Sequence, residues 1–150
     1  MADYQHILLA VDFSRNTDLV AQKALALRQA FGSRLSLVHV VEFVQVDLSS
    51  ELILPQELEM DRELLELARG RMKELVQRLD LADAAQHVLQ GSTRLEILRL
   101  AEEQKVDLIV LGSHGRHGLQ LLLGSTANAV LHGAPCDVLA VRIKESQMSR

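Results

Sequence analysis

The fold is indicated most clearly by the stretch VDLIVLGSHGRHGLQLLLGST, which spans residues 106–126. Its first six residues form a short, mostly apolar run, which suits a strand buried on both faces of a parallel sheet. The run leads into glycine-rich sequence, and Gly124 then opens a short helix that continues through Leu131. A buried strand that passes through such a loop into a helix is typical of the ligand-binding edge of an open α/β sheet.

The rest of the chain alternates strands and helices around this stretch. Short apolar runs predict four further strands, at 7–11, 35–41, 86–90 and 136–142. Apolar residues three or four positions apart predict helices between them, at 18–31, 55–78 and 93–105. Thr93 and Glu96 match a capping box at the start of the last of these. We therefore expect one α/β domain over residues 1–150, with a parallel sheet and right-handed crossovers.

Composition narrows the class of function. The 150 residues include 16 Lys plus Arg and 20 Asp plus Glu, for a net charge of −4, which argues against a general nucleic-acid or anionic-membrane binder. A single cysteine, Cys136, cannot form an internal disulfide and fits a reducing compartment. No apolar run approaches the ~20 residues that span a bilayer, and residues 1–6 lack the basic region of a signal peptide. These features predict a cytoplasmic location.

The glycine-rich loop has the chemistry of an anion site. Glycines let the backbone take positive φ and approach a ligand closely, and the N–H groups at a helix start are unpaired and carry partial positive charge. At Gly112, Gly115 and Gly124 a side chain would obstruct a phosphate, while Ser125 and Thr126 add hydroxyl donors.

The carboxyl ends of the first two strands fall on the same edge of the sheet. Asp12 there can accept hydrogen bonds from a ribose or a base amine, and Val40 offers backbone groups and an apolar wall for a base. Two nucleotide-binding motifs are absent. A Walker A loop needs a lysine directly after its last glycine, where Ser125 stands, and the turn after the first strand contains no glycine of a dinucleotide fingerprint.

Several segments together resemble the universal stress protein family. They are the Gly-Ser-His-Gly step at 112–115, the Gly-Ser step eight residues later, and the strand PCDVLAVR at 135–142. Further matches are HILLAVDFS at 6–14, LVHV at 37–40 and DLIVLG at 107–112. The resemblance covers nearly the whole chain, and 42–81 is its least diagnostic part.

The resemblance implies a Rossmann-like, doubly wound sheet of five parallel strands in the order 3-2-1-4-5, with helices on both faces. It also implies a role in the stress response and a homodimer formed through the C-terminal strand, by Val138, Leu139, Ala140 and Val141.

Members of the family that bind ATP carry a Gly-x2-Gly-x9-Gly-Ser/Thr pattern. Carried onto this sequence, the adenine and ribose contacts fall on Ala10, Asp12, Val40 and Leu111. The phosphate contacts fall on Gly112, His114, Gly115, Gly124, Ser125 and Thr126. In one departure, eight residues rather than nine separate Gly115 from Gly124, a difference that bears on the phosphate end of the site and not on the fold.

Three functions follow from these residues. The first is a regulatory or protective switch that binds an adenine nucleotide, ATP with or without Mg²⁺. The second is a dimeric interaction module without a nucleotide. The third is a slow ATPase, which is disfavoured because the loop shows no lysine, carboxylate pair or arginine finger. No catalytic residue is assigned, and His114 with His117 is too small a set to predict a metal site.

Overall fold

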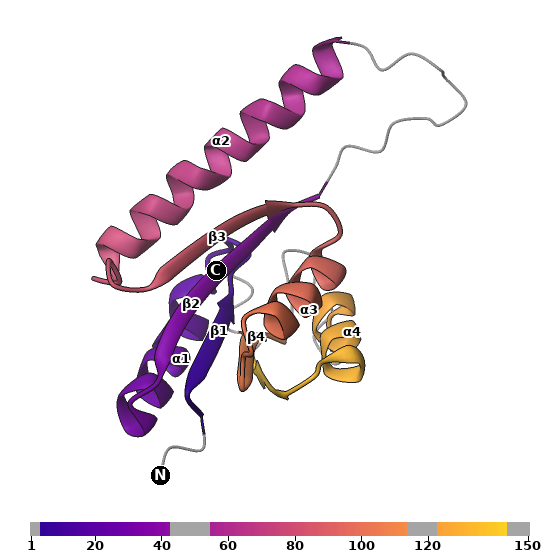
Figure 1. Cartoon of the computed structure of the whole chain (residues 1–150). Helices are drawn as coiled ribbons and strands as arrows, with labels where there is room; N and C mark the ends of the chain where they lie inside the picture. Colours follow the sequence, from indigo (N-terminus) through magenta and orange to yellow (C-terminus); the bar gives the residue numbers. More distant parts are fainter. Residues whose placement is uncertain (1–3, 43–54, 114–122, 144–150) are drawn as a thin grey trace.

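The computed structural model describes residues 4–42, 55–113 and 123–143 of the chain (Figure 1). Within these ranges strands and helices alternate from the first element to the last. The elements are β1 (His6–Ala10), α1 (Thr17–Phe31), β2 (Arg34–Val41), α2 (Pro55–Arg78), β3 (Ala85–Gln90), α3 (Thr93–Glu103), β4 (Leu108–Gly112), α4 (Ser125–Gly133) and β5 (Asp137–Val141).

The five strands form one parallel sheet in the order β3-β2-β1-β4-β5. β1 is the central strand, where Ile7 lies opposite Leu35 on one side and Leu108 on the other. The predicted doubly wound fold and its strand order are therefore confirmed. The direction of winding reverses between β1 and β4, and such a switch point leaves a crevice at the carboxyl ends of the strands.

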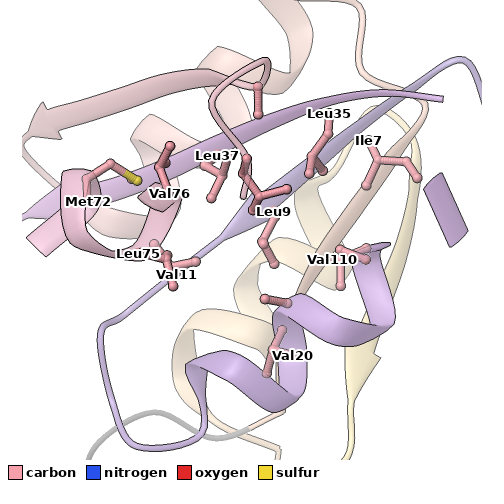
Figure 2. Packing of buried hydrophobic residues seen from close by; sticks show 14 of the residues in the cluster. Ile7, Leu9, Val11, Val20, Leu35, Leu37, Met72, Leu75, Val76 and Val110 are labelled. Carbon is pink, nitrogen blue, oxygen red and sulfur yellow. The ribbon is translucent and has the colours of Figure 1, made fainter. Parts of the chain in front are cut away.

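One face of the sheet is covered by α1 and α2. Val20 from α1 and Met72 and Leu75 from α2 pack with Leu9 and Leu37 of the central strands in one buried cluster (Figure 2). Leu9, Leu37 and Val110 are wholly inaccessible to solvent. Ala68, Met72 and Leu75, which lie three or four residues apart in the predicted helix at 55–78, are buried on this core-facing surface.

The opposite face is covered by α3 and α4, which lie side by side (Figure 1). Ile97 and Leu100 of α3 and Val130 of α4 pack there against Leu8 and Ile109. Successive residues of a strand point to opposite faces, so both faces of the central strands are buried. This arrangement explains why these strands read in the sequence as continuous apolar runs.

The capping box predicted at Thr93 and Glu96 is wrong. The N-cap of α3 is Ser92, which makes no side-chain capping bond, and Thr93 is already the first helical residue. The Thr93 hydroxyl donates instead to Oε1 of Glu42 at 2.8 Å, while Glu96 pairs with Arg99 one turn further along α3. Thr93 thus bonds to a residue that is distant in the sequence, and Glu96 bonds to a residue three positions along the same helix. Neither side chain makes the capping bond that the motif predicts.

Polar side chains are also buried near the amino ends of the strands, at the end of the sheet away from the crevice. His6 is 3% exposed; its Nδ1 lies 3.1 Å from the carbonyl oxygen of Gln104 and its Nε2 lies 2.7 Å from Oγ of Ser36. Burial, together with the Arg34 guanidinium, lowers the pKa of His6. Burial also lowers the pKa of His87, whose Nε2 has no hydrogen-bond partner among the described residues.

These two histidines predict a fold that loses stability in mild acid. Because their pKa values lie below the ordinary value of 6.5 in the folded state, the unfolded chain binds protons first as the pH falls. Their contribution is complete above about pH 6.5 and declines at lower pH. We expect the free energy of unfolding in urea to fall from pH 7.5 to 5.5, and the fall to be shallower in His87→Leu. An equal slope in wild type and variant would contradict the role of His87.

Within the described ranges, every helix is too short or too polar to cross a membrane.

Candidate functional site

A cavity of about 630 Å³ opens at the carboxyl edge of the sheet, in the crevice beside β1 and β4. Its volume lies within the ~300–1,000 Å³ that is usual for small-molecule sites. Its walls include eight of the residues predicted from the sequence: Ala10, Asp12, Val40, Leu111, Gly112, Gly124, Ser125 and Thr126. The other two, His114 and Gly115, lie outside the described residues.

Asp12 lies in the tight turn between β1 and α1. Its Oδ1 accepts hydrogen bonds from the backbone N–H of Ser14 at 3.0 Å and from the Thr17 hydroxyl at 3.3 Å. An aspartate that bonds the backbone two residues on stabilises such a turn. One carboxylate oxygen of Asp12 therefore holds the start of α1 in place, which fixes the carboxylate at the rim of the cavity.

The same turn has an uncommon backbone conformation at Phe13, where φ is 58°. Bulky residues adopt positive φ only where the surroundings enforce it. The Phe13 ring contacts the ring of His39, with 4.3 Å between centroids and a 41° tilt. His39 in turn donates from Nδ1 to the carbonyl oxygen of Val11 at 2.7 Å. This chain of contacts ties the turn to β2.

The start of α4 forms another part of the wall. Its N-cap is Gly124, whose N–H donates to the carbonyl oxygen of Ser113 at 2.7 Å, and no side chain caps the helix. The N–H groups of the first turn are therefore those of an uncapped helix start, where anions bind. Gly124 has φ −60° and ψ 155°, a backbone conformation that any residue can adopt. Glycine can matter at this position only for the room that it leaves.

Ser113 anchors the end of β4 to β5. Its side chain is 6% exposed, its N–H donates to the carbonyl oxygen of Val141 at 2.8 Å, and its Oγ accepts from the N–H of Ile143 at 3.2 Å. These bonds fix the point from which the chain leaves the sheet toward residue 114. Ser113 therefore positions the rim of the cavity and does not present a hydroxyl to solvent.

The sequence reasoning missed the wall that α2 provides. Leu64, Leu67 and Arg71 line the cavity, as do Glu42 and Thr93, the pair joined by a hydrogen bond at its rim. Leu64, Leu67 and Arg71 lie three or four residues apart, on the face of α2 that continues to Leu75. This spacing predicts a helix, but it does not show which part of the helix extends beyond the sheet and lines the cavity.

Two further observations concern the cysteine thiol and metal-binding side chains. Cys136 is half-buried, and burial together with the charges of Asp137 and Asp107 raises the pKa of its thiol, which disfavours the reactive thiolate. In the described parts of the chain, no group of three or more His, Cys, Asp and Glu side chains is arranged to hold a metal ion.

Comparison with known proteins gives a consistent result. The model of the universal stress protein family matches residues 3–142. Universal stress protein A homolog 2 of Coxiella burnetii is 44% identical over 147 residues, which cover 97% of this chain and 100% of that protein. The solved universal stress protein UspA of Lactobacillus plantarum superposes with a TM-score of 0.82 at 25% identity, over 95% of this chain and 100% of its own.

A solved universal stress protein in complex with cAMP has a TM-score of 0.59 at 22% identity, over 92% of this chain and 96% of its own. The family match covers residues 3–142 and therefore spans all five strands of the sheet. The chain belongs to the universal stress protein family.

Proposed function

We propose that this protein binds an adenine nucleotide, ATP or a product of its hydrolysis, as a regulatory or protective switch of the cytoplasmic stress response. The observation that carries the proposal is the convergence of eight separately predicted residues, from β1, β2, β4 and the start of α4, on the wall of one cavity. The cavity lies at the switch point of the sheet, where open α/β proteins bind their ligands.

Each part of the wall suits one part of the nucleotide. The uncapped N–H groups and the hydroxyls of Ser125 and Thr126 suit the phosphates, whose charge the helix dipole stabilises. Oδ1 of Asp12 already accepts two internal hydrogen bonds, so its Oδ2 would accept from the ribose or the base amine. Ala10, Val40 and Leu111 would supply the apolar wall for the base. Mg²⁺ would bind together with the phosphates of ATP.

The relatives support a nucleotide. A universal stress protein of the same fold has been solved with cAMP, which is an adenine nucleotide. The loop that is one residue shorter than the ATP-binding pattern bears on the triphosphate more than on the base, because the spacing of Gly115 and Gly124 affects only the phosphate end.

Thermal unfolding tests the proposal. With ATP plus Mg²⁺ at ~100 times Kd, binding to the folded state alone adds ~2.7 kcal/mol to its stability, and each kcal/mol raises Tm by ~2–4 °C for a domain of this size. We expect a rise of several degrees with ATP, ADP or AMP and a smaller one with GTP. Unchanged Tm values at millimolar nucleotide would overturn the proposal and favour an interaction module without nucleotide. Phosphate release from the same samples measures any hydrolysis.

We also propose that two copies pair through β5. This strand lies at an edge of the sheet and pairs only with β4 among the described strands. Leu139 is 36% exposed there, and such an edge is a template for pairing with another strand. Light scattering tests the proposal: a molar mass twice that of the 16.7 kDa chain supports it, and the mass of a single chain overturns it.

A further inference from the structure

The cavity extends over both faces of the sheet. Val38, Val40 and Leu111 face α3 and α4, and Val40 and Leu111 belong to the wall proposed for the base. His39 alternates with Val38 and Val40 along β2 and therefore points to the other face, toward α1 and α2. The lining on that side includes Phe13, Val20, His39, Leu64, Leu67 and Arg71, and we call this part of the cavity the α2 lobe.

The α2 lobe is largely apolar and open to solvent. Leu64 is 37% exposed and Leu67 is 52% exposed. Both line the cavity from α2, the helix whose Met72 and Leu75 are buried in the core (Figure 2). α2 continues beyond the sheet toward its N-terminal end (Figure 1). Large apolar side chains that line a cavity and stay exposed indicate a binding surface.

One positively charged side chain, Arg71, lies one turn beyond Leu67 along α2. Arg71 lines the lobe and forms no ion pair with any residue that the structure describes, whereas Arg69 pairs with Glu66 at 2.5 Å and Arg78 pairs with Asp18 at 2.6 Å. A guanidinium binds a carboxylate through two parallel hydrogen bonds. At ~1.5 Å of rise per residue, Leu64 lies ~10 Å along the helix from Arg71, a distance that a medium-length aliphatic chain spans.

We propose that the α2 lobe is a binding site for an aliphatic carboxylate. Its carboxylate pairs with Arg71, and its chain covers the exposed apolar surface of Leu64 and Leu67. The proposal goes beyond nucleotide binding and does not depend on it, since no residue of α2 belongs to the set proposed for the base, ribose or phosphates.

Calorimetric titration of the full chain with octanoate, without nucleotide, tests the proposal, and 1-octanol serves as the uncharged probe. We expect saturable octanoate binding that Arg71→Gln weakens about tenfold, as for the loss of a charge-assisted hydrogen bond. The same variant should bind 1-octanol as wild type does. Arg69→Gln, which removes a neighbouring arginine outside the cavity, should bind both probes as wild type does.

Two results would overturn the proposal: no saturable heat with millimolar octanoate, or equal octanoate affinity in wild type and Arg71→Gln. Arg71 is exposed, so the variant should keep the circular dichroism and Tm of wild type. Leu67→Ser gives a second measurement, because it removes apolar contact and should weaken octanoate and 1-octanol alike. Since ATP binding is measured separately by Tm, failure here and failure of the nucleotide proposal are distinguishable.

Discussion

Replacing Gly124 with valine is expected to weaken ATP binding on the order of a hundredfold, the loss of about two charge-assisted hydrogen bonds. Gly124 lines the cavity directly before the first N–H groups of α4, so a branched side chain there would occupy the space that a phosphate needs. Its backbone, with φ −60° and ψ 155°, lies in a region open to any L-residue, so valine introduces no strain. Tm without ligand should fall by only a few degrees, since valine is a poor N-cap residue.

Titration calorimetry with ATP measures this effect, and Gly70→Val is the matched control. Gly70 lies in α2, where an added Cβ would meet no atom within 4 Å, and it does not line the cavity. We expect the control to bind ATP as wild type does. Equal ATP affinity in Gly124→Val and wild type would remove the start of α4 from the proposed site, even if ATP still raised Tm.

Replacing Leu9 with alanine should lower the free energy of unfolding by about 3 kcal/mol, within the ~2–5 kcal/mol measured for buried leucines. Leu9 is wholly buried in the central strand, where it lies opposite Leu37 on β2 and Val110 on β4. Neighbours on both sides are held in the sheet ladder, so the space cannot close by a simple shift. The corresponding fall in Tm is ~6–12 °C.

Urea unfolding monitored by circular dichroism measures this loss, with Leu95→Ala as the control. Leu95 is 58% exposed on α3, so its truncation should change the stability by less than ~0.5 kcal/mol. Similar losses in the two variants would contradict the central position of Leu9 in the core.

Much of the fold could be predicted because both faces of the central strands are buried. Runs such as the one that contains Leu8 and Leu9 read as strands from composition alone, and α2 begins and ends at the predicted residues, 55 and 78. The strand order was predicted from the resemblance to a family, because an apolar run indicates a strand and does not indicate which strands lie beside it. The cap of α3 was mispredicted because the partner of Thr93, Glu42, is 51 residues away in the sequence.

Some residues of the candidate site could likewise be predicted from the sequence, and others could not. Asp12 and Gly112 could be placed from strand ends, which meet at one edge of a parallel sheet, and Gly124 and Ser125 from the start of the helix that follows β4. The contact between Phe13 and His39 could not be predicted, because a positive φ at a phenylalanine is set by tertiary packing against local preference. Nor could Arg71 be distinguished from Arg69, two residues away, until the position of α2 over the edge of the sheet was known.

The walls of the cavity are drawn from nearly the whole described chain, from Ala10 in β1 to Ile143 just after β5. β1 precedes β2 and β4 in the sequence and is synthesised before them, yet it lies at the centre of the sheet with both strands beside it. A nascent chain therefore has no site until synthesis has passed the last strand. A ligand cannot guide the early steps of folding, and it binds only chains that have been translated past β5 and have closed the sheet.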